Sequence, residues 1–202
     1  KERPDGICLS FGGQTGLNVG VELYDAGILE KYGVRVLGTP IEAIQDTEDR
    51  DLFVRAMSRS NCPVCRSKAV NSYAEAKKIA EEFGFPLMLR VAYVLGGKGS
   101  GIIYDWDQFE RMAKRGLAQS RINQILIEES VWGWKEIEFE ILRDADDNCF
   151  INCSMENVDP CGIHTGDSIV VAPAQTLTDE ELQLLRSASI RATREVGVCG
   201  EC

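Results

Sequence analysis

Arg90 stands between an apolar run and a glycine-rich loop, in the stretch LMLRVAYVLGGKGSG from residue 87 to residue 101. The apolar run predicts a buried strand over Leu87–Leu95, and the residues after the loop predict its return, so the loop joins strand to strand. Four glycines within six residues expose main-chain N–H groups that can surround an anion such as phosphate. The guanidinium of Arg90 can hold a second face of this anion, and Lys98 can close over it. An ordinary glycine-rich hairpin turn is the alternative.

The spacing of these glycines excludes two other kinds of phosphate-binding loop. A P-loop needs a longer spacer between its first glycine and the Gly-Lys-Ser/Thr triplet. A dinucleotide fingerprint opens a helix, whereas this loop precedes a strand. The pattern therefore favours a hairpin that covers a phosphate group as a lid.

A row of carboxylates lies in KEIEFEIL, residues 135–142. Alternation of charged and apolar residues is typical of a half-buried antiparallel strand, which places Glu136, Glu138 and Glu140 on one face. This face is either a solvated surface or the lining of a cleft. In a cleft, the carboxylates could bind a ribose, a metal or an alkali ion.

The single histidine lies in the loop ENVDPCGIHTGDS, residues 156–168, together with carboxylate, amide and hydroxyl groups. A lone histidine is often a satisfied structural residue. His164, however, is flanked by Gly162 and Gly166 in a polar segment and has no apolar face to fill. We therefore expect His164 to have a functional role.

Eight cysteines are present, and four of them form the CxxC pairs Cys62/Cys65 and Cys199/Cys202. A four-cysteine zinc site usually has its pairs about 15 to 20 residues apart, a spacing that these pairs do not match. A cysteine-held metal is kept as an alternative. The other four cysteines lie in or near apolar runs and are expected to pack as small hydrophobic residues. Reduced cysteines without an export signal predict a cytoplasmic protein.

The composition is that of a globular chain of 202 residues, 44% hydrophobic and 27% charged. A balance of 22 basic against 32 acidic residues argues against a broad surface for nucleic acid. No apolar run approaches the roughly 20 residues that span a bilayer, so no membrane association is expected. The chain opens with KERPDG rather than methionine, and we expect it to be cut from a longer protein.

The elements that would position these groups fall into two parts. The first part is predicted to be the end of a Rossmann-like parallel sheet. Its elements in order are an apolar strand over residues 5–11, a glycine turn, a helical pattern, a strand over 34–38 and a short helix over 40–44. A helix is expected to start at Thr47-Glu-Asp-Arg50, with the apolar face Leu52, Phe53, Ala56 and Met57. Further on, capping boxes are predicted at Ser72/Glu75 and Thr178/Glu181, with a strand over 67–70, a helix over 107–118, a strand over 123–130 and a last helix ending at Gly197.

Four motifs taken together resemble the large subunit of carbamoyl phosphate synthetase. They are TEDR at 47–50, Arg90 with GGKGSG, EESVWGWKEIEFE at 128–140, and ENVDPCGIHTGDSIVVAPAQTL at 156–177. The similarity covers essentially the whole chain, and the GIHTGDS form resembles the amino-terminal synthetase half. The resemblance implies a mixed α/β and α+β fold. Residues 1–46 would be the C-terminal part of a Rossmann-like pre-ATP-grasp domain, and residues 47–202 would form most of an ATP-grasp domain. Within the ATP-grasp domain, residues 47–131 would form a helix-rich part and the glycine lid subdomain, and residues 132–202 the truncated start of the second subdomain.

The resemblance also implies roles for particular residues. It implies that Arg50 and Arg90 contact the nucleotide phosphates and carboxyphosphate, and that Gly96 and Gly97 cover the phosphates. Adenine would be contacted by the main chain of Glu129 and Val131, and the ribose by Glu136. The phosphate end of the site would be lined by Gly162, Ile163 and His164. A potassium site is implied for Glu136, Asn157, Asp159, Pro160 and Ser168, while Glu138 would line the route by which carbamate leaves. Many family members have alanine and a bulky apolar residue where this chain has Pro160-Cys161.

The implied reaction is phosphoryl transfer from ATP with Mg²⁺ or Mn²⁺ to bicarbonate, followed by attack of ammonia to give carbamate. The implied partners are a glutaminase subunit or domain and the second synthetase half. In the family the magnesium ligands lie downstream of Cys202, so this chain is expected not to turn over by itself. The alternatives are another ATP-grasp carboxylate ligase, such as a biotin carboxylase, and a non-catalytic nucleotide- or metal-binding module. The choice between pyrimidine and arginine synthesis stays open.

Overall fold

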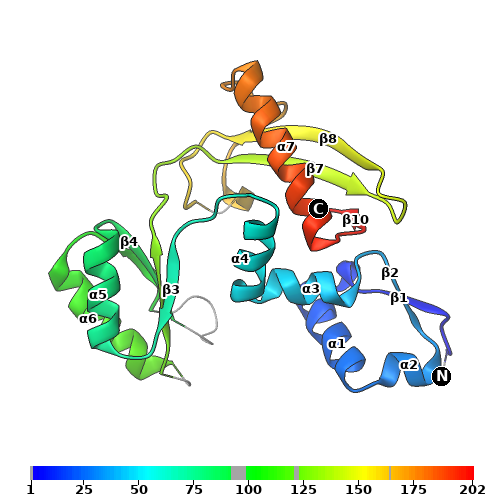
Figure 1. Cartoon of the computed structure of the whole chain (residues 1–202), viewed down its shortest axis with the longest axis horizontal. Coiled ribbons are helices and arrows are strands. Elements are labelled where there is room, and N and C mark those ends of the chain that lie inside the picture. Colours follow the sequence, from blue (N-terminus) through cyan, green and yellow to red (C-terminus); the bar gives the residue numbers. More distant parts are fainter. Residues whose placement is uncertain (1, 92–98, 121–122, 164) are drawn as a thin grey trace. The chain divides into compact units, whose positions relative to one another are not determined.

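The computed structural model describes residues 2–91, 99–120, 123–163 and 165–202 (Figure 1). The chain forms two compact units. The first consists of Lys1–Val64, Lys135–Asp159 and Ile163–Cys202, and the second of Cys65–Trp134 and Pro160–Gly162. Within the described ranges, no helix is both long and apolar enough to cross a membrane.

The second unit is a four-stranded antiparallel sheet that packs against two helices (Figure 1). Its elements are β3 (Ser67–Val70), α5 (Tyr73–Phe83), β4 (Leu87–Val91), β5 (Gly101–Ile103), α6 (Trp106–Gln119) and β6 (Ile125–Glu129). The strands lie in the order β3-β6-β4-β5. Leu87 and Leu89 of β4 and Ile127 of β6 are fully buried in one core cluster with residues of α5 and α6. The predicted strand-to-strand connection is confirmed, because β4 and β5 pair antiparallel on either side of the glycine-rich loop.

Both helices of the second unit begin at side-chain caps, which satisfy main-chain N–H groups that have no partner inside the helix. Ser72 Oγ accepts a hydrogen bond from the N–H of Glu75 at 3.3 Å, which confirms the predicted cap. The carboxylate of Glu75, however, accepts from the N–H of Asn71 at 3.2 Å. Asp105 caps α6 by accepting from the N–H of Gln108 at 2.8 Å.

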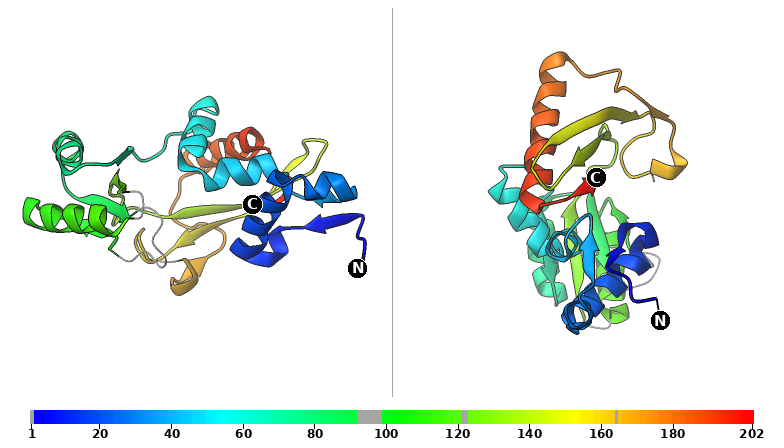
Figure 2. Two further views of the ribbon diagram at one scale, coloured as in Figure 1. Left: turned by 90° about the horizontal axis from the view of Figure 1, so that it is seen from below. Right: turned by 90° about the vertical axis from the view of Figure 1, so that its right-hand side faces the viewer.

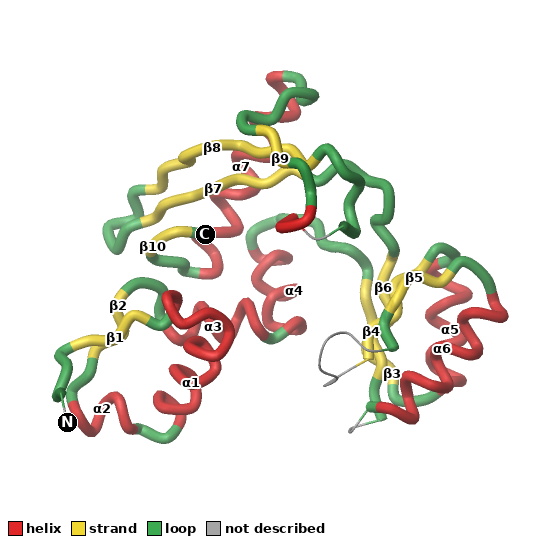
Figure 3. The backbone as a smooth tube through the Cα atoms, turned by 180° about the vertical axis from the view of Figure 1, so that it is seen from behind, coloured by secondary structure: helices red, strands yellow, loops and turns green. Residues whose placement is uncertain are grey.

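The first unit contains a second four-stranded sheet, in the order β10-β7-β8-β9 (Figure 3). Its strands are β7 (Ile137–Arg143), β8 (Cys149–Asn157), β9 (Val170–Val171) and β10 (Gly200–Glu201). The predicted hairpin is confirmed as β7 and β8, which pair antiparallel with a bulge between Glu140 and Ile141. Helix α7 (Asp179–Val196) packs against β7 (Figure 2). It starts at the predicted capping box of Thr178 and Glu181, where both reciprocal bonds are present.

The amino-terminal part of the first unit is a parallel strand pair with four helices. The elements are β1 (Gly6–Cys8), α1 (Gly13–Asp25), α2 (Ile28–Tyr32), β2 (Arg35–Leu37), α3 (Ile41–Glu48) and α4 (Arg50–Arg59). Parallel pairing of β1 with β2 confirms the predicted strand-helix-strand unit. Leu9, Ile41 and Ile44 form its buried core.

Two predicted boundaries are wrong near the amino terminus. The first strand ends at Cys8 instead of Phe11, because Ser10–Gly12 forms a short 3-10 helix (η1) that leads into α1. Phe11 is 91% exposed and lies outside any core. The short helix expected to end at Ile44 continues to Glu48 as α3.

The helix expected to start at Thr47 begins at Arg50 as α4. Thr47 instead belongs to α3, and its hydroxyl donates to the carbonyl oxygens of Ala43 and Ile44. The residue that follows α3 is Asp49, and its carboxylate accepts a hydrogen bond from the N–H of Leu52 at 3.0 Å. Among the residues expected to form the apolar face of α4, Ala56 and Met57 are buried and Phe53 packs beside them, whereas Leu52 is 37% exposed.

Candidate functional site

Arg90 lies on the face of its sheet that is opposite the core. Leu89 and Val91, its neighbours in β4, are buried in the core, so the alternation of a strand directs Arg90 the other way. Its side chain is 57% exposed. Arg90 is followed within two residues by the segment 92–98, which lies outside the described residues.

Arg90 forms an ion pair with a carboxylate that the sequence did not single out. Its Nε donates to Oε2 of Glu128 at 2.5 Å, and the Glu128 side chain is only 5% exposed. Glu128 belongs to β6, where the antiparallel register pairs Leu126 with Arg90 and thus places Glu128 on the same face, two residues along. The register between two strands far apart in the sequence is the signal that would have identified Glu128.

Glu129, the next residue, uses its side chain for a different pair. Its carboxylate accepts from Nε and from Nη2 of Arg66, both at 3.3 Å, and its N–H donates to the Arg66 carbonyl at 2.9 Å. The hydrogen bond from Arg66 holds the pKa of Glu129 below its ordinary value. The Arg66 guanidinium also lies 4.8 Å from the centre of the Phe83 ring. The Glu129 side chain is thus engaged by Arg66, and the main-chain contact to adenine that the resemblance implies stays a prediction.

The loop before His164 is held by a tryptophan. Gly162 has φ +111°, and a β-carbon added there would lie 2.6 Å from Cε3 of Trp132. Cys161 donates its N–H to the Trp134 carbonyl at 2.9 Å, and its own carbonyl accepts from the N–H of Gly133 at 3.4 Å. Segment 160–162 is therefore fixed to the turn at 132–134, close to Val131, whose carbonyl accepts from the N–H of Trp134 at 3.0 Å.

Glu136 and Asn157 come together where β7 and β8 pair. The N–H of Asn157 donates to the Glu136 carbonyl at 3.0 Å, and Nδ2 of Asn157 donates to Oε1 of Glu138 at 2.9 Å. A carboxylate only accepts hydrogen bonds, so this contact fixes which side of the amide faces Glu138. The opposite atom, Oδ1 of Asn157, is buried, and no described residue donates a hydrogen bond to it. A buried acceptor without a donor is costly unless a cation or water meets it.

Asp159 and Ser168 are also brought together. Oδ2 of Asp159 accepts from Oγ of Ser168 and from the N–H of Ile169, each at 3.1 Å. The N–H of Val158 donates to the Ile169 carbonyl at 2.8 Å. Four of the five residues expected around potassium thus form two contacting pairs in the first unit, while Pro160 is grouped with the second unit.

Glu156 is a further buried residue that the sequence did not assign to the site. It is 8% exposed, and its Oε2 accepts from the N–H groups of Gln175 and Thr176 at 2.9 and 3.0 Å. The Thr176 hydroxyl also donates to Glu156, and these hydrogen bonds hold the pKa of Glu156 below its ordinary value. Lys135 Nζ lies 2.6 Å from the Thr176 hydroxyl oxygen. Glu156 therefore connects the two ends of the motif ENVDPCGIHTGDSIVVAPAQTL through hydrogen bonds.

Several predicted residues lie outside this description. Gly96, Gly97 and His164 are not among the described residues, and neither is the side chain of Arg50, which begins α4. Ile163 follows Gly162 and is half-buried. The proximity of Arg90 to His164 therefore stays a prediction.

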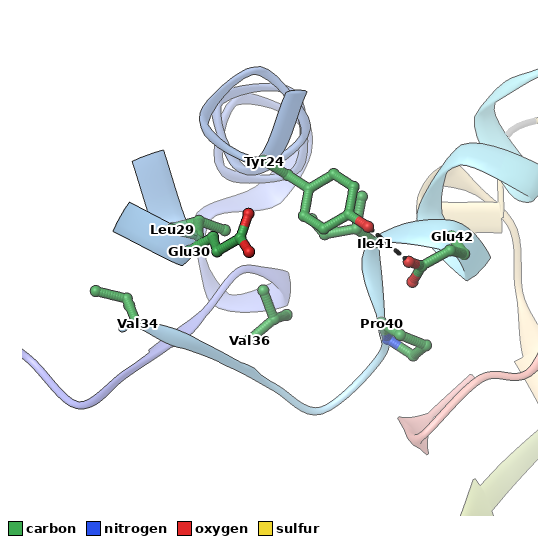
Figure 4. A pocket seen from close by; sticks show the side chains of 8 residues that line it. All are labelled: Tyr24, Leu29, Glu30, Val34, Val36, Pro40, Ile41 and Glu42. Atoms are coloured by element: carbon green, nitrogen blue, oxygen red, sulfur yellow. Dashed lines mark hydrogen bonds between the residues drawn. The ribbon is translucent and has the colours of Figure 1, made fainter. Parts of the chain in front are cut away.

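A cavity of about 520 Å³ lies elsewhere, in the amino-terminal part of the first unit (Figure 4). It is lined by Tyr24, Leu29, Glu30, Val34, Val36, Pro40, Ile41 and Glu42. The Tyr24 hydroxyl donates to Oε1 of Glu42 at 3.0 Å, and this bond raises the pKa of Tyr24. None of the residues predicted to bind a ligand lines this cavity, so it is not the candidate site.

All eight cysteines are free thiols. Across the described part of the chain, no group of three or more His, Cys, Asp or Glu side chains is placed to hold a metal ion.

Comparison with protein families gives two matches, which together cover nearly the whole chain. Residues 49–202 match the family model described as "Carbamoyl-phosphate synthase L chain, ATP binding domain". Residues 1–46 match the "Carbamoyl phosphate synthase preATP-grasp domain". The chain belongs to the carbamoyl phosphate synthase large-chain family. The resemblance stated from the sequence motifs is thereby confirmed.

Relatives within the carbamoyl phosphate synthase family are similar along the entire chain. The large chain, N-terminal section, of Methanopyrus kandleri is 57% identical over 202 residues, which are 100% of this chain and 36% of that protein. The large chain of Methanosarcina mazei is 55% identical over 202 residues, again 100% of this chain and 19% of that protein. The chain therefore spans about a third or less of the length of these relatives.

Solved structures confirm the predicted ATP-grasp fold. A biotin carboxylase complex with β,γ-ATP from Campylobacter jejuni has a TM-score of 0.74 at 20% identity, over 98% of this chain and 44% of that chain. The biotin carboxylase domain of 2-oxoglutarate carboxylase from Hydrogenobacter thermophilus, in complex with MgADP, ADP and bicarbonate, has a TM-score of 0.71 at 22% identity, over 91% of this chain and 41% of that chain. At these identities the likeness shows the fold alone. The family match places the chain among carbamoyl phosphate synthases rather than biotin carboxylases.

Proposed function

We propose that this chain is the segment of carbamoyl phosphate synthase that presents the γ-phosphate of MgATP to bicarbonate. An oxygen of bicarbonate attacks the γ-phosphorus, the bond to ADP breaks, and carboxyphosphate forms. Ammonia then displaces phosphate to give carbamate. Such a reaction depends on positioning and on neutralising charge at the transferred group, since little covalent chemistry is left to the protein.

The observation that carries this proposal is the placement of Arg90. Its guanidinium is exposed on the side of β4 that faces away from the core with α5 and α6, where the strand leads into the glycine-rich loop. A guanidinium remains charged and presents its donors in a planar fork that suits phosphate oxygens. In a chain that matches an ATP binding domain, this is the side chain we assign to the transferred phosphoryl group.

The remaining site residues are assigned in the same proposal. The phosphates would be surrounded by Arg50, Gly96, Gly97, Gly162, Ile163 and His164. Adenine would be contacted by the main chain of Glu129 and Val131, and the ribose would be bound by Glu136. The engaged side chain of Glu129 supports a main-chain role for that residue. The steric requirement for glycine at position 162 comes from the Trp132 ring, which lies directly against the main chain there.

A potassium ion is part of the proposal, and the residues present fit it. The buried Oδ1 of Asn157 is an acceptor without a described donor, and carbonyl and carboxylate oxygens suit a hard cation. The ion would be held by Glu136, Asn157, Asp159, Pro160 and Ser168. It would offset the negative charge of the carboxylates among them. Asn157→Ala is expected to raise the potassium concentration that half-activates the enzyme. Asn148→Ala, in the exposed hairpin turn, is the control and should leave it unchanged.

The partners in this proposal are those that the family resemblance implies. A glutaminase subunit or domain would supply ammonia, and a second synthetase half would phosphorylate the carbamate. One relative, the arginine-specific mitochondrial large chain of Neurospora crassa, is 54% identical. Both arginine synthesis and pyrimidine synthesis are therefore kept as pathways for the product. Eight free thiols support a reducing compartment, and we place the protein in the cytoplasm.

The proposal is tested by ATP hydrolysis that depends on bicarbonate, in a complete large chain that contains this segment. Arg90→Ala is expected to lower this rate about a hundredfold or more, as does removal of a donor from other transition states that carry charge. The control is Arg111→Ala, an exposed arginine of α6 whose Nε donates to the Asp107 carbonyl. Equal rates for the Arg90 variant and wild type would contradict the proposal.

A further inference from the structure

Glu128 and Arg90 form a pair in which the carboxylate is buried and the guanidinium is exposed. The exposed fractions of their side chains are 5% and 57%. Burying a carboxylate is costly unless a cation and hydrogen bonds compensate for its lost hydration. Arg90 therefore stabilises a glutamate at this position, whereas the guanidinium of Arg90, on an exposed surface, would stay hydrated without Glu128.

The contact between the two side chains uses one edge of the guanidinium. Nε of Arg90 donates to Glu128, and within the described ranges no residue accepts a hydrogen bond from the two terminal nitrogens. Because a guanidinium is planar and rigid, holding Nε fixes the direction of both terminal N–H₂ groups. Lysine, with a single nitrogen on a flexible stem, could not be held at one side and donate in a fixed direction at the other.

We infer that Glu128 is a positioning residue, which holds Nε of Arg90 so that the terminal nitrogens are directed at the phosphates of the nucleotide. This inference rests on the proposed role of Arg90. Glu128 itself touches no reacting atom. Its contribution is to fix, before the nucleotide arrives, a long side chain that would otherwise lose its rotational freedom on binding.

A simple electrostatic role for Glu128 makes the opposite prediction. A carboxylate beside Arg90 reduces the attraction of that site for an anion, so its removal alone would strengthen ATP binding. Removal of a positioning residue weakens ATP binding, because Arg90 must then be ordered by the nucleotide. The sign of the change in affinity therefore separates the two roles.

The experiment is a calorimetric titration of ATP into a complete large chain that contains this segment, and into a set of variants of it. The set is Glu128→Gln, Glu128→Asp, Arg90→Ala and the double variant of Arg90→Ala with Glu128→Gln. Glu110→Gln is the matched control, since it removes the carboxylate of an exposed ion pair with Lys114 on α6. Circular dichroism establishes that each variant is folded.

We expect Glu128→Gln to weaken ATP binding about tenfold, in line with the loss of an oriented contact to a charged group. Glu128→Asp, which keeps the carboxylate but withdraws it by one methylene, should lie between wild type and the glutamine variant. In the Arg90→Ala background, Glu128→Gln should have no further effect, because Glu128 acts through Arg90. Glu110→Gln should bind like wild type.

Other results separate the inference from the proposed function. Weaker binding by Arg90→Ala together with unchanged or tighter binding by Glu128→Gln overturns the inference alone. So does an effect of Glu128→Gln that persists in the Arg90→Ala background. Wild-type affinity in Arg90→Ala, or no binding by the wild-type chain, contradicts the proposed function and the inference with it. If Glu128→Gln does not fold, Glu128→Asp decides in its place, and binding as tight as wild type overturns the inference.

Discussion

Glu156 is a buried carboxylate whose oxygens accept hydrogen bonds from the main chain and side chain of residues 175–176. These bonds favour the ionised form and hold the pKa of Glu156 below its ordinary value in the folded chain. A group with a depressed folded pKa contributes stability above its unfolded pKa, and this stability is lost as the pH falls through the folded pKa.

Substitution of this carboxylate tests its contribution through pH. Glu156→Gln should lower the free energy of unfolding at neutral pH, and the difference from wild type should shrink as the pH is lowered to about 3. Urea unfolding measured across this range checks it. The control is Glu180→Gln, an exposed residue of the first turn of α7. A difference that stays constant with pH would mean that ionisation of Glu156 does not stabilise the fold.

Gly162 and Gly133 allow steric exclusion to be separated from backbone strain. Both have positive φ, +111° and +83°, but a β-carbon at Gly162 would meet Trp132, whereas one at Gly133 would meet no atom within 4 Å. Each alanine substitution should cost about 1 to 3 kcal/mol for its backbone conformation. Gly162→Ala should cost more than Gly133→Ala, and the excess should disappear in a Trp132→Ala background. Equal costs in urea unfolding would show that the Trp132 contact does not exclude a side chain.

At the scale of elements, the helix that begins at Arg50 shows how a local signature can mislead. Thr47 followed by acidic residues and an apolar pattern has the composition of a helix start. The last turn of α3, however, engages the Thr47 hydroxyl through its own carbonyl groups, and Asp49 accepts the hydrogen bond at the start of α4. Local rules carry no information on where the preceding helix ends.

A pair of substitutions tests this assignment of the cap. Asp49→Ala should destabilise the chain by about 1 kcal/mol, the usual cost of a lost N-cap. Thr47→Ala should change stability by less, because it replaces a mid-helix hydroxyl with the residue that helices favour most. Thermal and urea unfolding of the two variants checks the order. A larger loss for Thr47→Ala would restore the cap to Thr47.

An element or contact is predictable from the sequence when the residues that define it are close together in the sequence. Caps at Ser72 and Thr178 and the presence of a strand at Arg90 were predicted correctly, because each depends on residues within one turn or one strand. Glu128 was missed as the partner of Arg90 because its place depends on the register between β4 and β6. The contact of Trp132 with Gly162 likewise joins residues that are distant in the sequence.

At the scale of the whole chain, the core of the first unit joins segments from both ends of the sequence. Ala43 of α3, Met57 of α4 and Val196 of α7 belong to one buried cluster. Thr39 and Cys199 exchange hydrogen bonds of 3.0 and 3.3 Å. Helix α3 runs across residue 46, where we place the domain boundary, so the two proposed domains share this core within the first unit.

Removal of the largest side chain of this cluster tests the shared core. Met57→Ala should lower the free energy of unfolding by about 2 to 5 kcal/mol, as is usual for a buried methionine. Leu184→Ala is the control, since Leu184 is 67% exposed on α7 and should cost about 0.5 kcal/mol or less. Urea unfolding followed by circular dichroism gives both values. Similar costs for the two variants would show that the cluster does not join the amino- and carboxyl-terminal segments.

The central claim is that this segment directs a phosphoryl group onto bicarbonate, and the fate of a bicarbonate oxygen tests it most directly. A complete large chain that contains the segment is incubated with ATP and bicarbonate labelled with oxygen-18, without ammonia, and the inorganic phosphate is analysed by mass spectrometry. If carboxyphosphate forms and breaks down to carbon dioxide and phosphate, an oxygen of bicarbonate stays on phosphorus. The account predicts labelled phosphate from the wild type and its loss in Arg90→Ala, whereas ATP hydrolysis that yields unlabelled phosphate would contradict it.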